Sequence, residues 1–550
     1  MVRALWRKLQ TTVTGGAILV SSSWFVSKLL GFLRERMIAA KFGASFETDA
    51  YNAAFGVPDF IYGTLILGSL LSVFIPVFIR YRQQEATEAF RVANSILNVI
   101  ILIFLASGLV LFVFAPQIIS LIAPGFDSGR LTLATTMTRI IAVNILLFGV
   151  SNVLSGMLNA ARQFLAFSIA PVLYNLGIIS GIVWLVPTLG IVGVAVGAII
   201  GAVLHVLVQV PAVVRTGFRY QAVLDLRHAG VREIGRLIVP RAFGQSVTQL
   251  DQLINLIIGS TLAIGSVTIF RWATNIQDLP VTLIGVSLAT VVFPVFSEAL
   301  ARDDRPTFVE HFSRVIRQIL FLIIPLSVLF LLLRAQAVRV ILGAGRFDWP
   351  ATILTANTLG FFALSFFAQS LIPVLARSFY ALRDTATPVK ITVVAVVLNI
   401  LGSLLLTRGF SLGPWDVPAL GVRGLALAYS ISSVIGMLLM YLTLRVRLGD
   451  LDDDRVVRTT VRVLLASALM ALVVQGAKYT IVEVFGVTLA TGVGVLTQLL
   501  VSGVVGGVAY LAFAVFLRLD EVTLIRDWLS RARFSLFNGR GTETKLSHDR

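Results

Sequence analysis

The stretch Gly15-Gly-Ala-Ile-Leu-Val-Ser-Ser-Ser-Trp-Phe-Val-Ser-Lys-Leu-Leu-Gly-Phe-Leu33 decides the fold class. It contains one charged residue, Lys28, and is close to the ~20 residues that a helix needs to cross a bilayer. Arg3, Arg7 and Lys8 precede it, and no clear signal-peptide cleavage site follows a short apolar core. We therefore expect a retained first transmembrane helix.

Similar apolar stretches recur along all 550 residues, of which 57% are hydrophobic and only 13% are charged. A mean hydropathy of +0.91 leaves too little polar surface to cover a soluble globule of this size. The sequence predicts an all-α membrane protein with about 14 transmembrane helices. We place these helices near residues 15–33, 50–79, 93–122, 132–158, 164–186, 189–214, 234–259, 266–296, 318–338, 351–376, 388–407, 417–444, 463–485 and 489–517.

The net charge of +17 is explained by membrane topology. If the N-terminus is cytoplasmic, most lysine and arginine residues fall in cytoplasmic loops and tails, and both termini are cytoplasmic. Nucleic-acid binding is therefore not expected. The absence of cysteine excludes disulfides and thiolate chemistry, and no P-loop, HExxH or GxSxG motif is present. We expect a protein that is not an enzyme, has no cofactor and is not an ATP-driven pump.

An internal repeat divides the chain into two lobes. Three pairs of similar segments occur in the same order, and their separation grows along the chain: 71–78 with 289–296, 171–177 with 395–402, and 189–195 with 420–426. Because six helices return the chain to the side on which it started, the lobes should be parallel six-helix repeats. The predicted divisions are an N-lobe at 1–215, a C-lobe at 216–447, two extra C-terminal helices at 448–518 and a cytoplasmic tail at 519–550.

Charged residues inside predicted membrane helices are costly and usually face a cavity. In the first helix, Lys28 and Glu35 lie seven residues apart on one face, and Arg34 lies beside them. In the second, Asp49, Asp59 and Tyr62 accompany Pro58, which predicts a kinked or broken helix.

The eighth helix places Arg271, Asn275 and Asp278 on one face before Pro280, and the seventh contains Arg241. A basic cavity for phosphate or pyrophosphate follows from these cations. The alternative is that Arg271 pairs with Asp278 or Asp251 for structural reasons alone.

A cation site is a second expectation, because carboxylate and amide oxygens suit a hard cation such as sodium. Its candidate ligands are Asp251 and Asn255 in the seventh helix and Asp384 before the eleventh. Asp384 could instead cap the helix that follows it. Coupling of transport to sodium or to a proton stays open.

The sequence resembles the MurJ (MviN) family of lipid II flippases, within the group of multidrug, oligosaccharidyl-lipid and polysaccharide exporters. The resemblance covers roughly residues 15–445. Its most specific segments are Ser27-Lys-Leu-Leu-Gly-Phe-Leu-Arg-Glu35, Phe42-Gly-Ala44, Thr48-Asp-Ala50, Phe74-Ile-Pro-Val77, Ser155-Gly-Met-Leu-Asn-Ala160 and Ala170-Pro-Val-Leu-Tyr-Asn175. The resemblance implies fourteen helices, a cationic cavity between the lobes, and a groove formed by the last two helices for a polyprenyl tail.

The resemblance also assigns residues to that cavity. The family's cations in the first helix fall on Lys28 and Arg34, its acidic partner on Glu35, and its early second-helix aspartate on Asp49. Two positions depart from the family pattern, because Tyr62 and Asn275 stand where arginines are usual. Arg271, one turn before Asn275, offers a replacement charge.

The resemblance implies a flippase that moves lipid II from the inner to the outer leaflet of the bacterial cytoplasmic membrane by alternating access. The membrane potential or an ion gradient would drive it, with membrane lipids and cell-wall synthesis proteins as partners. The alternatives are a flippase for another lipid-linked glycan, a cation-coupled exporter of the same group, or a non-transporting scaffold of cell-wall assembly. A respiratory antiporter-like subunit would need a series of mid-helix Lys and Glu residues that this chain lacks.

Overall fold

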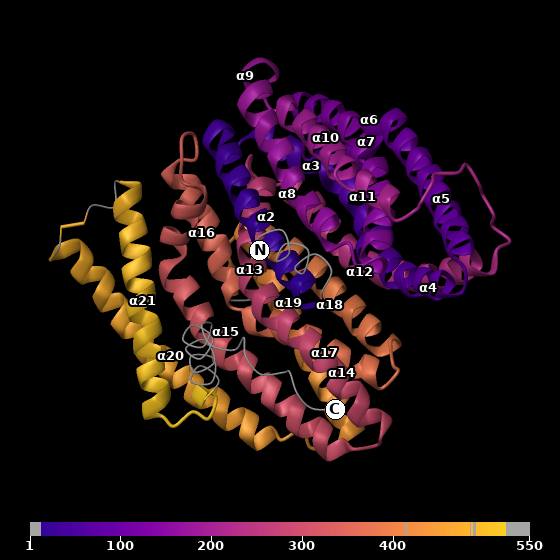
Figure 1. The fold of residues 1–550 in the computed structure, drawn as a ribbon. Coiled ribbons are helices and arrows are strands. Elements are labelled where there is room, and N and C mark those ends of the chain that lie inside the picture. Colours follow the sequence, from indigo (N-terminus) through magenta and orange to yellow (C-terminus); the bar gives the residue numbers. More distant parts are fainter. Residues whose placement is uncertain (1–12, 413–414, 485, 488–490, 524–550) are drawn as a thin grey trace, which may run out of the picture. The chain divides into compact units, whose positions relative to one another are not determined.

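The structure is a computed structural model that describes residues 13–412, 415–484, 486–487 and 491–523 (Figure 1). Helices make up nearly all of this part of the chain. The strands that it contains are the short antiparallel pair β1, Phe410–Leu412, and β2, Trp415–Val417, in which Ser411 lies opposite Asp416. The predicted tail beyond residue 523 and the basic residues at positions 3, 7 and 8 lie outside the described residues.

The helices of the first predicted lobe follow one another with short connections. They are α2 (Val13–Phe42), α3 (Phe46–Tyr62), η1 (Gly63–Leu70), α4 (Leu71–Gln84), α5 (Ala86–Val113), α6 (Ala115–Ile122), α7 (Ser128–Ala160), α8 (Phe164–Ser180), η2 (Gly181–Leu185), α9 (Val186–Leu189), α10 (Val192–Leu207) and α11 (Val210–Arg215).

The later part of the chain continues in the same manner. Its helices are α12 (Ala229–Ser260), α13 (Ser266–Pro280), η3 (Val281–Val286), α14 (Ser287–Ala301), α15 (Arg305–Leu342), α16 (Trp349–Ala363), α17 (Phe366–Ala381), α18 (Ala386–Arg408), α19 (Val422–Leu448), α20 (Asp453–Glu483) and α21 (Gly492–Phe516).

Eleven helical segments of the described chain are long and apolar enough to cross a membrane, and twelve if the bent pair α16 and α17 is one span. Helices α2 and α12 coincide with the two remaining predicted spans. In helix α12, Gln245, Gln249, Asp251 and Asn255 interrupt the apolar residues. The prediction of a polytopic all-α membrane protein is confirmed.

Two proline-containing helices continue through π-helical turns rather than breaking. Helix α3 contains Pro58 and passes through η1 into α4, and α13 ends at Pro280 and passes through η3 into α14. Because proline cannot donate a backbone hydrogen bond, a local change of helix pitch near it is expected. The same order of elements occurs at both copies of the repeated 71–78 and 289–296 segments.

The described chain forms two compact units, which are interleaved in sequence. The first contains residues up to 275, 338–358 and 392–432, and the second contains 276–337, 359–391 and the residues from 433 onward. The lobe boundaries predicted from the repeat stay a prediction.

Glycines set the closest helix packing in the first unit. Gly177 and Gly181 face Gly193, Gly197 and Gly201 of α10, and a Cβ built on Gly177 would lie 2.2 Å from the Cα of Gly201. Small residues four apart are the usual means by which membrane helices approach closely, because lipid supplies little hydrophobic drive for helix association. This packing fixes α8, which contributes Tyr174 and Asn175 to the site described below.

In the second unit, α20 and α21 lie side by side, at the yellow end of the colour scale in Figure 1. Gly506 of α21 packs against Val474 of α20 and Leu329 of α15, and the Tyr510 hydroxyl donates a 2.7 Å hydrogen bond to the Phe321 carbonyl. These contacts attach the two extra C-terminal helices to α15.

Candidate functional site

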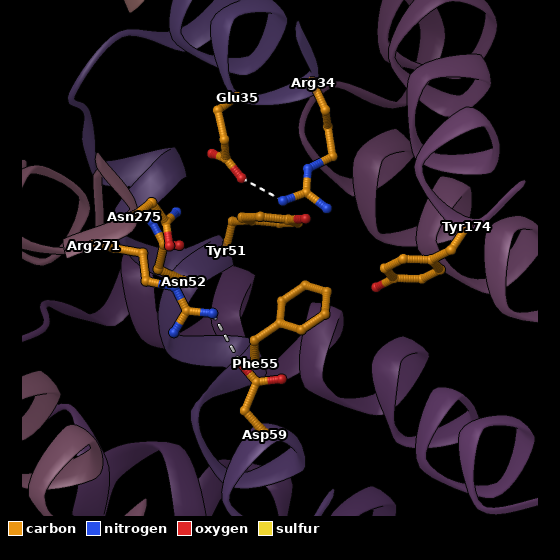
Figure 2. Close-up of a pocket in the computed structure, with 9 residues that line it drawn as sticks. All are labelled: Arg34, Glu35, Tyr51, Asn52, Phe55, Asp59, Tyr174, Arg271 and Asn275. Atoms are coloured by element: carbon orange, nitrogen blue, oxygen red, sulfur yellow. Dashed lines mark hydrogen bonds and ion pairs between the residues drawn. The ribbon is translucent and has the colours of Figure 1, made fainter. Parts of the chain in front are cut away.

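A polar cavity of about 210 Å³ lies within the first unit (Figure 2). Helices α2, α3, α8 and α13 form its walls. Five of its lining residues were predicted from the sequence, namely Arg34, Glu35, Asp59, Arg271 and Asn275, and four were not, namely Tyr51, Asn52, Phe55 and Tyr174.

Arg34 is held on α2 by two neighbours. Its Nη2 lies 2.6 Å from Glu35 Oε1, and its Nη1 donates a 3.1 Å hydrogen bond to Asn175 Oδ1 of α8. Glu35 in turn accepts a 2.9 Å hydrogen bond from the indole of Trp272, which is fully buried on α13. Fixed on both sides, the Arg34 guanidinium has few conformations to lose when it binds an anion.

The opposite side of the cavity contains a second ion pair. Arg271 Nη2 of α13 lies 3.0 Å from Asp59 Oδ2 of α3, and both side chains are partly exposed. Figure 2 shows this pair on the other side of the cavity from Arg34 and Glu35. Arg271 thus pairs with Asp59, whereas Asp251, one of the two partners considered for it from the sequence, accepts a hydrogen bond from Asn399.

Aromatic rings separate the two ion pairs. Tyr51 and Phe55 lie one helical turn apart on α3 with ring centroids 5.0 Å apart, and Tyr174 enters from α8 (Figure 2). Tyr51, Phe55 and Asp59 recur every four residues and so share one face of the helix. That spacing was present in the sequence and could have identified Tyr51 and Phe55.

The cavity combines two guanidinium groups with two carboxylates. Each cation already has an acidic partner at hydrogen-bond distance, so the cavity is less basic than the sequence suggested. A pyrophosphate has more acceptor oxygens than a carboxylate and can take the place of Glu35 or Asp59 at the guanidinium groups. The arrangement is therefore suited to reversible binding of an anion.

Four predicted residues of the first unit lie elsewhere. The Lys28 ammonium lies 5.8 Å from the ring centroid of Trp24, and Arg241 donates a 2.7 Å hydrogen bond to the Ser72 hydroxyl. Tyr62 lines a second cavity. Asp49 is bonded to the start of α13.

Asp49 is buried where α3 meets the start of α13. Its carboxylate accepts hydrogen bonds from Gly265 N at 2.6 Å, from Thr268 N at 2.9 Å and from the Thr268 hydroxyl at 2.7 Å. A carboxylate at the N-terminus of a helix satisfies amides that have no intrahelical partner. Asp49 therefore joins two helices and does not line the cavity.

Asp278 belongs to the second unit, where its side chain is exposed. The cavity described above is formed by residues of the first unit alone. A substrate role for Asp278 stays a prediction.

The protein-family comparison identifies the chain. Residues 38–496 match the model described as lipid II flippase MurJ. The chain belongs to the MurJ family of lipid II flippases. It is a transporter-family protein and not an enzyme, as the sequence predicted.

Curated MurJ relatives align over most of the chain. A lipid II flippase MurJ of Burkholderia cenocepacia is 29% identical over 437 residues, which are 78% of this chain and 83% of the relative. A probable lipid II flippase MurJ of Rhizobium tropici is 27% identical over 535 residues, 94% of this chain and 96% of the relative.

Solved structures show the fold that this MurJ-family chain shares. One of them is a lipid II flippase MurJ in an inward closed conformation. Its alignment with this chain covers 91% of this chain and 99% of the MurJ structure, with a TM-score of 0.75 and 23% identity. Another is an inward-facing multidrug resistance MATE transporter. Its alignment covers 80% of this chain and 99% of the MATE structure, with a TM-score of 0.65 and 16% identity. The chain has the MurJ and MATE fold.

Two of the three candidate cation ligands meet in the first unit of this MurJ-family protein. Asn399 Nδ2 of α18 donates a 2.7 Å hydrogen bond to Asp251 Oδ1 and lies 3.5 Å from Asn255 Oδ1. All three side chains are buried. Asn399 was missed as a ligand candidate, although the repeat pairs it with Asn175.

Asp384 is part of the second unit and caps α18. It accepts hydrogen bonds at 2.9 Å from the backbone amides of Ala386 and Thr387, and it pairs with Arg447. Partial burial tends to raise the pKa of Asp384, but hydrogen bonds from Thr387 and Arg447 outweigh it and lower the pKa to about 2. No group of three or more His, Cys, Asp or Glu side chains within the described residues is arranged to hold a metal ion.

Proposed function

We propose that this protein moves lipid II from the inner to the outer leaflet of the bacterial cytoplasmic membrane. Lipid II is an undecaprenyl pyrophosphate with a sugar-peptide headgroup. The observation that supports this most directly is the placement of Arg34 and Arg271 in one cavity of a MurJ-family chain. Both termini would be cytoplasmic, as the distribution of basic residues predicts.

In this proposal the pyrophosphate replaces the carboxylates as partner of the two guanidinium groups. Each charge-assisted hydrogen bond contributes about 1.5–3 kcal/mol in a protein environment. Glu35 and Asp59 remain close enough to take the arginines back when the substrate leaves. The cavity can therefore bind the headgroup without retaining it, which transport requires.

Alternating access of two parallel repeats would expose the cavity first to the cytoplasm and then to the outside. The polyprenyl tail would remain in lipid, along the groove formed by α20 and α21. The membrane potential or an ion gradient would supply the drive. If transport is coupled to an ion, sodium or a proton would bind at Asp251, next to Asn255 and Asn399. Cell-wall synthesis proteins that consume the product are the expected partners.

Three alternatives use the same fold for another purpose. A different lipid-linked glycan, or a drug exported with a cation, would suit the fold shared with a MATE transporter. A non-transporting scaffold would need no working cavity, and Tyr62 and Asn275 reduce the positive charge that a family cavity usually has.

Complementation tests the proposal. The gene would be expressed in bacteria depleted of their own lipid II flippase, with membrane insertion confirmed by immunoblotting. Growth and labelling of lipid II in the outer leaflet are expected. Lysis despite normal membrane abundance would remove lipid II as the substrate.

A further inference from the structure

A second cavity of about 160 Å³ lies in the first unit beside the first. It shares Phe55, Asp59 and Tyr174 with the cavity in Figure 2. Its other lining residues come from α3 and α7 and are Pro58, Tyr62, Ile141, Asn144, Ile145 and Phe148.

Asn144 of α7 has no hydrogen-bond partner in this cavity. Its side chain is 3% exposed, and neither its Nδ2 nor its Oδ1 atom is hydrogen-bonded. Buried polar groups of native proteins nearly always have partners, so an unpaired amide at a cavity wall indicates a group that enters the cavity. That group must offer an acceptor to Nδ2 and a donor to Oδ1.

Aromatic rings form the remaining wall. The ring centroid of Phe148 lies 5.4 Å from that of Tyr62 and 4.9 Å from that of Tyr174. The Tyr62 hydroxyl accepts a 3.0 Å hydrogen bond from Asn152, so its own hydrogen can be donated to a ligand. Apolar rings with a few convergent polar groups are typical of sites that bind small molecules.

The two cavities differ in the charge of the residues that line them. The charged residue that lines it is Asp59, one oxygen of which is already paired with Arg271. No lysine or arginine of the described chain lines it, which disfavours a phosphate. A purely apolar ligand would leave the Asn144 amide unpaired.

We propose that the second cavity binds an uncharged sugar ring with an acetamido group or a pair of adjacent hydroxyls. This rests on the proposed function and assigns a separate part of the site to the sugar that follows the pyrophosphate. An acetamido group supplies both the donor and the acceptor that Asn144 lacks, and the C–H face of a sugar ring packs on aromatic rings. A cavity of about 150 Å³ holds benzene, so the second cavity has room for the sugar ring, and the substituents of the ring would extend toward the adjoining first cavity.

The shared residues connect the two parts of the site. Because Phe55, Asp59 and Tyr174 line both cavities, a ligand whose phosphates contact Arg271 can place its next ring against Phe148. The first cavity then recognises charge, and the second recognises the sugar.

Binding of two lipids to the full-length protein in detergent tests this assignment. The probes are lipid II and undecaprenyl pyrophosphate, which has the same phosphates but no sugar. The variant is Asn144→Leu, which keeps the side-chain size and removes the amide. The matched control is Thr138→Val, because Thr138 is buried on the same helix, its hydroxyl is bonded to the Ala134 carbonyl, and it does not line the cavity.

Asn144→Leu should weaken lipid II binding about tenfold, corresponding to loss of one or two hydrogen bonds. It should leave binding of undecaprenyl pyrophosphate unchanged, and Thr138→Val should affect neither lipid. An equal loss for both lipids, or no loss for either, would overturn the sugar site. In the wild-type protein, equal affinity for the two lipids would overturn it as well, whether or not the variant folds. If the wild-type protein binds neither lipid, the proposed function itself fails.

Discussion

Arg271 on α13 and Asp59 on α3 form an ion pair whose Nη2 to Oδ2 distance is 3.0 Å, and it lies at the cavity wall. The two side chains are 48% and 39% exposed, so both can be reached from the cavity. In the proposed function, this pair keeps a guanidinium at the cavity wall until an anion replaces the carboxylate.

Asp59→Asn should strengthen anion binding and slow release. Removal of the carboxylate takes away the group that competes with pyrophosphate for Arg271, whereas Arg271→Gln removes the cation itself. We expect tighter binding of undecaprenyl pyrophosphate by the first variant, weaker binding by the second, and slower flipping by both. Binding in detergent and flipping in vesicles measure these effects.

The control for this prediction is Glu298→Gln. Glu298 pairs with Arg302 at 2.6 Å on the exposed end of α14, and neither residue lines the cavity. Weaker pyrophosphate binding by Asp59→Asn would show that Asp59 supports the site rather than competing with the substrate.

Arg34→Ala should abolish transport without lowering membrane abundance. The guanidinium contacts Glu35 and Asn175 at the cavity wall, so its loss removes the proposed phosphate ligand and few packing contacts. Arg36→Ala is the matched control, since Arg36 donates to the Val340 and Gly343 carbonyls and does not line the cavity. That control should lower stability while each folded molecule still transports. Flipping by Arg34→Ala at the wild-type rate would remove Arg34 from the site.

The sequence predicted the fold and the charged residues that line the cavity, but it also predicted Lys28, Arg241 and Asp49 there, which lie elsewhere. Charges such as Arg34 and Arg271 stand out because they are expensive in apolar helices. Tyr174 could not be found in this way, because an aromatic residue in an apolar helix has the same pattern whether it faces lipid, core or cavity. The sequence also did not show which residues are hydrogen-bonded to one another. Asn175 and Asn399 were recognised as equivalent in the repeat, but only the structure shows that each hydrogen-bonds a charged residue, Arg34 and Asp251.

Asp49 shows that the sequence alone does not distinguish an aspartate that joins two helices from one that lines a cavity. An aspartate early in a membrane helix was expected to contact the substrate, but it accepts three hydrogen bonds from the start of α13. Asp49→Ala should therefore cost about 2–5 kcal/mol of stability, because it leaves buried donors without an acceptor. Thermal unfolding and membrane abundance provide the measurement. A well-folded variant that no longer binds lipid II would return Asp49 to the substrate site.

Asp384 should contribute stability at neutral pH through its helix cap and its pair with Arg447. Its folded-state pKa of about 2 lies below the usual value of an aspartate, so the contribution is present above about pH 4 and is lost as the pH falls toward 2. Asp384→Asn should lower stability by about 0.5–2 kcal/mol at pH 7, equally with and without sodium. Unfolding curves at pH 5 to 8 should show a constant difference from the wild type. A difference that appears only with sodium would instead support a cation site.

The energy source can be tested by separating voltage from ions. Lipid II has a diphosphate and peptide carboxylates, so outward flipping moves negative charge toward the positive side of an energised membrane. Each charge that crosses the full field gains about 2.3 kcal/mol per 100 mV. Arg34 and Arg271 offset part of the substrate charge in the cavity, and cations that move with the substrate would change the total. Depolarisation by an ionophore at constant ATP should slow flipping and retain lipid II in the inner leaflet.

Asp251→Asn provides the second arm of this test, because it removes the charge of a buried carboxylate that accepts a hydrogen bond from Asn399. If voltage alone drives transport, Asp251→Asn should flip at the wild-type rate and the rate should not depend on sodium. A wild-type rate that survives confirmed depolarisation but falls on removal of sodium, or in Asp251→Asn, would instead make the ion gradient the driving force.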